Sequence, residues 1–266
     1  MTLEATDPHL LVLGVRGSIP VAGPRFDRYG GNSTCFALII DGQIHAAIDA
    51  GSGLVTAREP LADHVDILLT HYHWDHIQGL SMLGAMWAGD VDLHIVGQGD
   101  PHAALATAIR PPVFPVSIDG APRPIRYQTA GDHELAGGVL ARSFPVHHPQ
   151  GAVGYKLIGP NRTIAVVTDH ESHSSVDDIV AQQIQGVDVL IHDAQYTAEE
   201  YEARVGWGHS TWEHAAKMAI RAEVGELLLT SHDPWHDDDK VDEIVERAAG
   251  LFENTHGIRE GQRLAL

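Results

Sequence analysis

Apolar residues recur in short blocks along the chain, and the spacing of the blocks changes between its two halves. Continuous apolar runs of strand length occupy residues 10–15, 36–40, 44–48, 65–70, 91–96, 139–146, 152–158, 164–168, 187–191 and 227–230. Apolar residues at helical spacing predict helices over residues 102–110, 176–184, 212–220 and 241–248. The first half is therefore rich in strands, and the second alternates strands with helices. This pattern predicts an α/β fold in which two sheets pack together with helices on the outside.

Three of the predicted helices follow signals for a helix start. Asp100-Pro101 supplies an N-cap and a first-turn proline, a serine cap precedes Val176, and Ser210-Thr211-Trp212-Glu213 has the spacing of a capping box. A capped start fixes the backbone of the residues just before it. The third signal therefore draws attention to His209, the residue that precedes the box.

The composition is that of a globular chain of 266 residues, with 44% hydrophobic and 20% charged residues. This length suits one α/β core, and we expect a single domain over residues 1–266. No apolar run approaches the ~20 residues of a membrane span, so we expect no membrane association. Residues 1–7 lack the basic and apolar regions of a secretory signal, and Cys35 is the only cysteine. These features favour a cytoplasmic protein without an internal disulfide or a thiolate-built zinc site.

Acidic residues outnumber basic residues by 36 to 17, which gives a formal net charge of −19 with histidine neutral. Proteins that follow a nucleic-acid backbone depend on clustered lysine and arginine. This chain offers only scattered candidates for a basic patch, at Arg16, Arg25, Arg28, Arg123 and Arg126. A large nucleic acid is therefore not an expected partner.

Six of the apolar runs end at, or just before, a histidine or an aspartate. The residues concerned are Asp49, His71, His147-His148, Asp169, His192-Asp193 and His232. Neighbouring strands that end at one edge of a sheet would bring these side chains together, and binding sites of open sheet proteins favour that location. The sequence thus predicts a functional site at one sheet edge.

The densest group of potential metal ligands directly follows the run at residues 65–70. His71, His73, Asp75 and His76 place three imidazoles and one carboxylate within six residues. Such nitrogen and oxygen donors suit zinc, and also iron or manganese. In an extended or tightly turning loop, His71 and His73 would point the same way while Asp75 and His76 reach a second position. One ion cannot easily use all four side chains, so the cluster predicts two metals side by side.

These residues resemble the metallo-β-lactamase superfamily of binuclear hydrolases, over nearly the whole chain. The resemblance rests on His71-x-His73-x-Asp75-His76, on His148, Asp169 and His232, and on Asp49-Ala50-Gly51-Ser52-Gly53. It implies a four-layer αβ/βα sandwich of two mixed β-sheets with outer helices, and metals at the upper edge of the sheets. It also implies two divalent ions per chain, with zinc as the first expectation and manganese or iron as alternatives.

The resemblance also implies which side chains hold each ion. His71, His73 and His148 would hold the first metal, and Asp75, His76 and His232 would hold the second. Asp169 would bridge the two metals, and Asp49 would orient a ligand histidine from outside the centre. His148 is preferred to His147 because it precedes Gly154-Tyr155 by six residues, as in the family's pattern.

Further motifs are similar to the phosphodiesterase branch of the superfamily, which includes ribonuclease Z and the cyclic-phosphate phosphodiesterase of the carbon–phosphorus lyase pathway. These motifs are Arg16-Gly17-Ser18-Ile19-Pro20, Tyr29-Gly30-Gly31-Asn32-Ser33-Thr34-Cys35 and Gly208-His209-Ser210-Thr211. Bacterial ribonuclease Z has a long arm inserted between the third ligand histidine and the bridging aspartate. This arm clamps transfer RNA. Here only 21 residues separate His148 from Asp169 (169 − 148 = 21), which leaves no room for that arm.

The expected substrate is therefore a small or cyclic phosphodiester. Two adjacent cations that share a solvent oxygen lower its pKa, so a metal-bridging hydroxide is available near neutral pH. Asp75 would orient this hydroxide, and His209 would donate a proton or a hydrogen bond to a phosphoryl or leaving-group oxygen.

Other functions remain open from the sequence. The same two-metal site would serve a hydrolase of carboxylic esters, lactones or thioesters, and a non-catalytic metal-binding protein is a further alternative. The branch is often dimeric, so a homodimer is an additional expectation. Asp193 would either orient a histidine from outside the centre or have a structural role at its strand end. His147, His170, His173 and His236 border the same loops, and the sequence assigns them no role.

Overall fold

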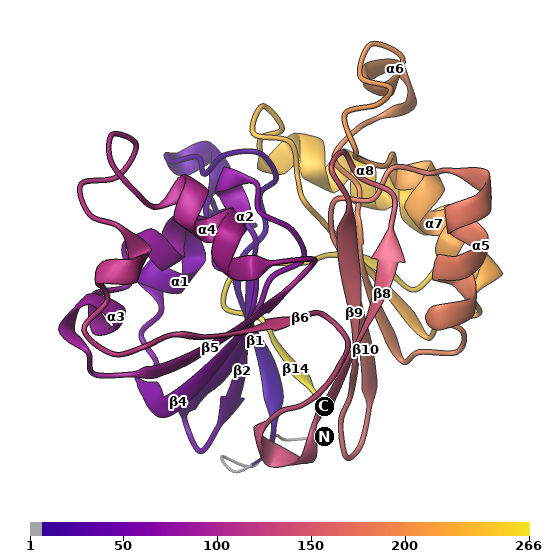
Figure 1. The fold of residues 1–266 in the computed structure, drawn as a ribbon. Coiled ribbons are helices and arrows are strands. Elements are labelled where there is room, and N and C mark those ends of the chain that lie inside the picture. The colour runs from indigo at the N-terminus through magenta and orange to yellow at the C-terminus, as the bar shows by residue number, and fades with distance from the viewer. Residues whose placement is uncertain (1–6) are drawn as a thin grey trace.

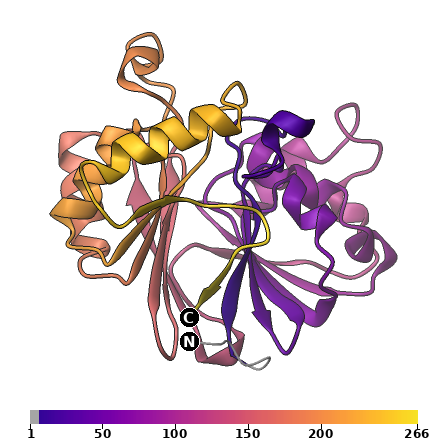
Figure 2. The same cartoon turned by 180° about the vertical axis from the view of Figure 1, so that it is seen from behind.

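Two β-sheets of seven strands each face one another across an apolar interior, and helices cover their outer faces in the computed structural model (Figures 1 and 2). The structure describes residues 7–266. Parallel and antiparallel neighbours occur in both sheets, so both are mixed. The expected αβ/βα sandwich is confirmed.

The first sheet comes mainly from the N-terminal half of the chain. Its strand order is β14 (Arg263–Ala265), β1 (His9–Gly14), β2 (Cys35–Ile40), β3 (Gln43–Ile48), β4 (Leu61–Leu68), β5 (Asp92–Gly97) and β6 (Arg126–Thr129). The last strand of the chain, β14, returns to this sheet and pairs antiparallel with β1, with His9 opposite Ala265. The two ends of the described chain therefore lie close together, as Figure 1 shows.

The second sheet comes from the C-terminal half. Its strand order is β13 (Thr255–Gly257), β12 (Glu226–Thr230), β11 (Val189–Asp193), β10 (Thr163–Val167), β9 (Ala152–Ile158), β8 (Leu140–Val146) and β7 (Asp132–Glu134). Strands β10, β11 and β12 are mutually parallel. Strand β8 runs in the same direction, because it and β10 both pair antiparallel with β9.

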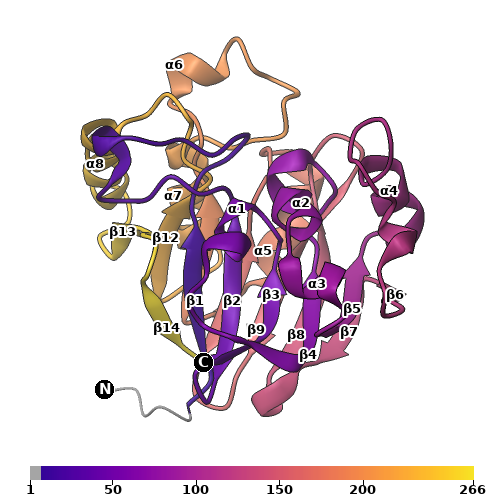
Figure 3. The ribbon, with the colours of Figure 1, turned by 90° about the vertical axis from the view of Figure 1, so that its left-hand side faces the viewer.

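Helices cover each sheet from outside. The first sheet carries α1 (Ser52–Thr56), α2 (Trp74–Ser81), α3 (Gly84–Ala88) and α4 (Pro101–Ala108), which face the viewer in Figure 3. The second carries α5 (Ser174–Gln183), α7 (Trp212–Arg221) and α8 (Asp238–Ala249), whereas α6 (Ala198–Tyr201) lies on a loop that projects beyond the sheets in Figure 1. Short 3₁₀ turns occupy Pro24–Phe26, Ile118–Gly120 and Ala136–Gly138. None of the helices within residues 7–266 has the length and apolar character needed to span a membrane.

Strands buried on both faces explain why the sequence shows continuous apolar runs rather than alternation. In β2, Phe36 and Leu38 pack into the interior between the sheets, whereas Ala37 and Ile39 pack with the outer helices. All ten runs identified in the sequence form strands, and all four expected helices form within a few residues of the predicted bounds.

The strands that the sequence did not reveal are the four edge strands β6, β7, β13 and β14. Each has only three or four residues, and most of those residues are exposed or half-buried. Edge strands of soluble proteins are commonly short and polar, so they leave no apolar run to recognise. Helices α1, α2, α3 and α6 were also not predicted, since they are short.

Two details of the sequence interpretation were wrong. The ligand-rich segment is not a continuous loop, because helix α2 begins at Trp74 and places Asp75 and His76 in its first turn. The N-cap of helix α5 is His173, so the residue at this position is not the expected serine.

Candidate metal centre

The strand-end residues meet at one edge of the sandwich because of the strand directions. Strands β3 and β4 of the first sheet are parallel, and β8, β10, β11 and β12 of the second share one direction. Asp49 and Asp169 follow β3 and β10 with positive φ angles of 58° and 50°. Aspartate tolerates this left-handed conformation better than most residues, which suits it to these sharp strand-end turns.

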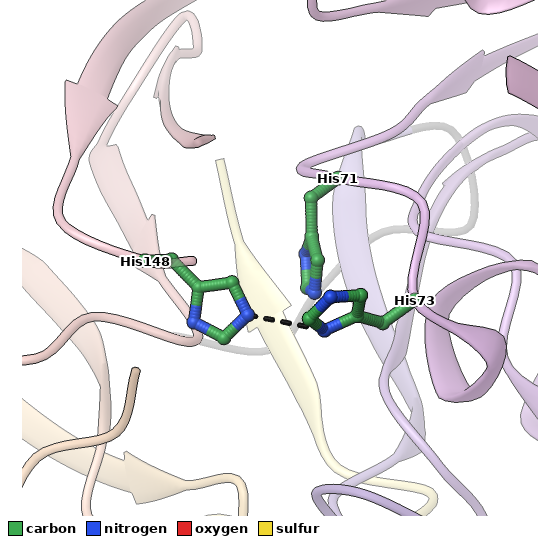
Figure 4. Close-up of side chains that lie close together, drawn as sticks. All are labelled: His71, His73 and His148. Carbon is green, nitrogen blue, oxygen red and sulfur yellow. Dashed lines mark hydrogen bonds between the residues drawn. The ribbon is translucent and has the colours of Figure 1, made fainter. Parts of the chain in front are cut away.

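Three histidines converge at this edge from opposite sheets. The ligand-type nitrogens of His71, His73 and His148 lie within 4.8 Å of one another. Nε2 of His148 lies 3.1 Å from Nδ1 of His73, and Figure 4 shows the three rings pointing toward one another. His147 instead approaches the carbonyl of Glu171, with Nδ1 3.2 Å from the oxygen. The structure thus brings together the three residues expected for the first metal, with His148 rather than His147.

A second group adjoins the first and shares His71 with it. The ligand-type atoms of His71, His76 and Asp169 also lie within 4.8 Å of one another. Oδ2 of Asp169 lies 3.2 Å from Nε2 of His76, 3.5 Å from Nε2 of His71 and 3.9 Å from Nε2 of His148. Asp169 therefore stands between the two groups, where a bridging ligand belongs. Oδ2 of Asp75 lies 3.2 Å from Nε2 of His76, on the side of the second group.

Hydrogen bonds outside the centre fix the tautomers of the two first-site histidines that come from loops. Nδ1 of His148 donates to the carbonyl of Gly208 over 2.8 Å, which leaves the lone pair of Nε2 free. Nε2 of His73 donates to Oε1 of Gln150 over 3.0 Å, which leaves the lone pair of Nδ1 free. These tautomers follow from the hydrogen-bond network, and both present a free lone pair to the centre, as a metal requires.

Asp49 and Thr70 fix the tautomers of the other two histidines, His76 and His71. Oδ2 of Asp49 accepts from Nδ1 of His76 over 2.7 Å, which is the contact expected of a carboxylate that orients a ligand histidine. The Thr70 hydroxyl donates to Asp49 and accepts from Nδ1 of His71 over 3.1 Å. In both histidines Nε2 then faces the centre.

The charge balance of the centre calls for a cation. Nε2 of His71, Nε2 of His76 and Oδ1 of Asp169 are buried without a hydrogen-bond partner among the described residues. Burial lowers the pKa of His71 well below its usual value. Burial also acts to lower the pKa of His76, but Asp169, Asp75 and Asp49 outweigh it and raise that pKa well above the usual value. A divalent ion would replace the proton on His76 and satisfy the unpartnered atoms, so the residues present fit a metal centre.

His232 is the expected ligand that the structure does not bring into these groups. It follows β12 and is buried, and its ring packs edge-on against Tyr29 with the centroids 5.5 Å apart. Neither of its ring nitrogens has a hydrogen-bond partner within residues 7–266, and no cluster of ligand-type atoms in that range includes it. Burial lowers its pKa well below the usual value, which keeps the imidazole neutral as a ligand must be. Its role at the second metal stays a prediction.

His209 lies beside the centre and is held there by Asp193, for which the sequence left open either the orientation of a histidine or a structural role. Nδ1 of His209 lies 2.7 Å from Oδ2 of Asp193, and Nε2 points toward Oδ2 of Asp169 at 3.8 Å. Burial acts to lower the pKa of His209, but Asp169 and Asp193 outweigh it and raise the pKa to about 9. Bound cations would offset the charge of Asp169 and leave Asp193 as the carboxylate that favours the imidazolium. The position of Asp193 at a strand end was the only sequence signal for it.

The expected capping box after His209 is wrong in its register. Thr211, not Ser210, is the N-cap of α7, and its hydroxyl accepts from the backbone N–H of His214 over 3.3 Å. The Ser210 hydroxyl is engaged elsewhere, because it donates to the carbonyl of His170. The backbone of this segment is nevertheless fixed, since Ser210 N–H donates to Asp193 over 3.2 Å.

Three further histidines near these loops, His170, His173 and His236, belong to none of the clusters of ligand-type atoms within residues 7–266. Nδ1 of His170 accepts from the N–H of His147, and its Nε2 lies 3.0 Å from Asp177. Nε2 of His236 lies 2.8 Å from Oε1 of Glu200. His173 is exposed.

Arg16 ties together the loops on the other side of the centre and is not a surface cation. It is fully buried, and its guanidinium donates to the carbonyls of Gly30 and His236 over 2.8 and 2.7 Å. The N–H of Ser18, two residues later, donates to Oδ2 of Asp75 over 2.8 Å. The motif that begins at Arg16 therefore positions the carboxylate of Asp75. Because Arg16 is buried, it adds no positive charge to the protein surface.

Gly208 allows the close approach of its loop to His148, and we predict that Gly208→Ala displaces that ligand. Its φ is +89°, and a Cβ atom there would lie 2.1 Å from Nδ1 of His148. We expect the affinity for the first metal to fall by at least the ~10–100-fold typical of changes just outside a metal centre. Competition with a chelator measures this loss.

Gly206→Ala is the matched control, because its φ of +86° imposes similar strain but its Cβ would meet nothing within 4 Å. Equal affinities in the two variants would show that strain, and not contact with His148, decides the effect.

Comparison with known proteins places the residues of both ligand groups within one matched family domain. Residues 46–232 match the family described as the beta-lactamase superfamily domain. The ribonuclease Z of Anoxybacillus flavithermus is 32% identical over 104 residues, which cover 38% of this chain and 32% of that protein. This match therefore spans only about a third of the length of that relative.

Solved structures extend the likeness to the whole fold. The metallo-beta-lactamase fold protein YhfI from Bacillus subtilis has a TM-score of 0.73 and 21% identity, with 97% of this chain and 99% of that chain covered. A diphosphatase from the PhnP family has a TM-score of 0.72 and 18% identity, with 97% and 98% covered. At these identities the likeness establishes a common fold.

Proposed function

The chain belongs to the beta-lactamase superfamily, and on this premise we propose that it is a metal-dependent hydrolase of a small or cyclic phosphodiester. The observation that carries the proposal is the buried His209–Asp193 pair, whose free Nε2 faces Asp169 at the edge of the metal centre. It adds a cationic donor to a site whose buried histidines and carboxylates fit metal ions.

We assign the metals to the residues as follows. His71, His73 and His148 would hold one divalent ion, Asp75, His76 and His232 would hold a second, and Asp169 would serve as a ligand at both positions. Zinc fits these nitrogen and oxygen donors, as do manganese and iron. When bound, the ions supply Lewis acidity, which polarises the phosphoryl group and makes bound water acidic.

Three side chains, those of Asp75, His209 and Asp193, orient the water and supply the proton in the reaction. Asp75 orients the attacking water from a position fixed by the Ser18 N–H. His209 donates its Nε2 proton to the leaving alkoxide, while Asp193 keeps the imidazole oriented and favours its protonated form. The protonated imidazole of His209 also stabilises the negative charge that grows on the non-bridging oxygens of the phosphoryl group.

Charge favours a phosphodiester over a neutral ester. A phosphodiester is an anion and gains further negative charge as it reacts, so a protonated His209 beside two divalent ions complements it throughout. A lactone or a thioester is neutral, and it makes less use of an additional cation before the transition state.

Several features support a small substrate. The interval in which bacterial ribonuclease Z carries its arm is occupied here by the antiparallel pair β9 and β10. The net charge is −19, and Arg16 is buried. A long polyanion would find little cationic surface.

We predict that the metal-loaded protein prefers a phosphodiester to a lactone or a thioester. The measurement is kcat/KM for one substrate of each class and for a precursor transfer RNA at physiological salt, with Asp169→Asn as the control for contaminating activity. The phosphodiester should give the highest value, and the 3′ trailer of the transfer RNA should not be removed. A higher kcat/KM for the lactone or the thioester would replace the proposal, and efficient trimming would overturn the small-substrate part of it.

A further inference from the structure

A separate cluster of metal-type side chains lies between the two sheets, away from the centre described above. It consists of Asp66 on β4, His94 on β5 and His133 on β7, whose ligand-type atoms lie within 4.8 Å of one another. Asp66 precedes His71 by five residues along β4 and its extension, a distance of roughly 16 Å at ~3.3 Å per residue. An ion held by this cluster would therefore be distinct from both catalytic metals.

The ligand atoms already have nearly the spacing that a zinc ion imposes. Oδ1 of Asp66 lies 3.0 Å from Nδ1 of His94 and 3.0 Å from Nε2 of His133. A tetrahedral ion with bonds of ~2.0–2.1 Å holds its ligand atoms roughly 3.3 Å apart. The two distances from Asp66 are thus within a few tenths of an ångström of this spacing, and the nitrogens of His94 and His133 lie within 4.8 Å of each other.

His64 approaches the same carboxylate, but its tautomer makes it a donor rather than a ligand. Nη2 of Arg126 donates to Nδ1 of His64 over 3.1 Å, so the proton of this imidazole is on Nε2. That nitrogen lies 3.5 Å from Oδ1 of Asp66. The cluster therefore offers three protein ligands, a number that leaves a zinc ion one position for water.

The surroundings favour a cation. A cavity of about 650 Å³ adjoins the cluster and is lined by the carboxylates of Asp63, Asp66 and Glu134 against the single cation of Arg126. Asp66 is only 5% exposed, so its charge is poorly screened by water. Burial lowers the pKa of His94, with His133 and Arg126 acting in the same direction, although Asp66 opposes them. This keeps His94 in the neutral form that binds metal.

We propose that Asp66, His94 and His133 bind an additional divalent transition-metal ion, with zinc as the best match to two imidazoles and a carboxylate. The ion links β4 and β5 of the first sheet to β7 of the second. Strand β7 is a three-residue edge strand with little apolar burial of its own, so a metal bond fixes it where packing does not.

The competing interpretation is that Asp66 only accepts hydrogen bonds from the two imidazoles. His133→Gln distinguishes hydrogen bonding from metal binding, because the amide of glutamine can still donate to Asp66 but is a poor zinc ligand. His102→Gln is the matched control, since His102 is exposed and pairs with Asp119 on another face of the first sheet.

The experiment loads each protein with zinc, removes free metal by gel filtration and counts bound zinc per chain by elemental analysis. Wild type and His102→Gln should bind one equivalent more than His133→Gln, and phosphodiester turnover should be the same in all three. This difference does not depend on how many ions the catalytic centre holds or on its substrate. Equal zinc content in wild type and His133→Gln would overturn the proposal.

A second measurement does not rely on the folding of a variant. Crystals of the zinc-loaded wild-type protein should give an anomalous scattering peak ~2.0–2.1 Å from the three ligand atoms. A map with peaks at the catalytic centre and none beside Asp66 would also overturn the proposal.

Discussion

Asp169→Asn should lower phosphodiester turnover by more than the ~10²–10⁴-fold that a single positioned acid contributes. The reason is that Oδ2 of Asp169 lies within 3.2 Å of His76 and within 3.9 Å of His148, so one carboxylate serves both metal positions. The neutral amide weakens both, and bound metal should fall by one equivalent. Asparagine tolerates the positive φ of this position, so the substitution tests charge and ligation rather than backbone strain.

The measurement combines kcat with elemental analysis of protein purified without chelator. Asp119→Asn is the control, because it removes an exposed carboxylate that pairs with His102 and belongs to neither ligand group of the centre. A variant Asp169→Asn that kept both metals and wild-type turnover would remove the bridging role from this residue.

His209→Ala should keep both metals and the fold, yet lose ~10²–10⁴-fold in turnover of a phosphodiester with an alkoxide leaving group. His209 is not needed as a ligand, because seven other residues account for the metal chemistry. The loss should shrink for a nitrophenolate leaving group, which needs little protonation, if proton donation to the leaving group is the main role. An equal loss on both substrates would assign His209 to phosphoryl binding instead.

His173→Ala is the control for this prediction, because it removes an exposed histidine from the loop before α5. Near-wild-type activity of His209→Ala on both substrates would remove the observation on which the phosphodiesterase proposal rests. A loss of metal in His209→Ala would show that the residue belongs to the ligand set.

The sequence revealed the parts of this molecule that depend on local pattern. Buried strands appear as apolar runs, and the proposed ligands His71 and Asp169 directly follow two of them, so the edge at which they meet could be predicted. The resemblance also implied that Asp49 orients a ligand histidine, and the structure places Asp49 beside His76. Each of these features needs only the strand directions and the residues next to the strand ends.

What the sequence did not reveal depends on contacts between distant segments. The pairing of His209 with Asp193 joins a strand end to a loop 16 positions later, and no periodic pattern encodes it. The cluster around Asp66 was missed because its third member, His133, lies on a short polar edge strand. The approach of Gly208 to His148 depends on the path of a loop.

The central claim is that two metal ions and His209 act together on a phosphodiester, and one measurement tests it most directly. It is a crystal structure of the metal-loaded protein with a slowly hydrolysed phosphorothioate diester. We expect two metal peaks with Asp169 between them, the phosphorothioate across both ions, and the leaving-group oxygen facing Nε2 of His209. A single metal peak at this edge, or an analogue bound without contact to the metals or to His209, would contradict the claim.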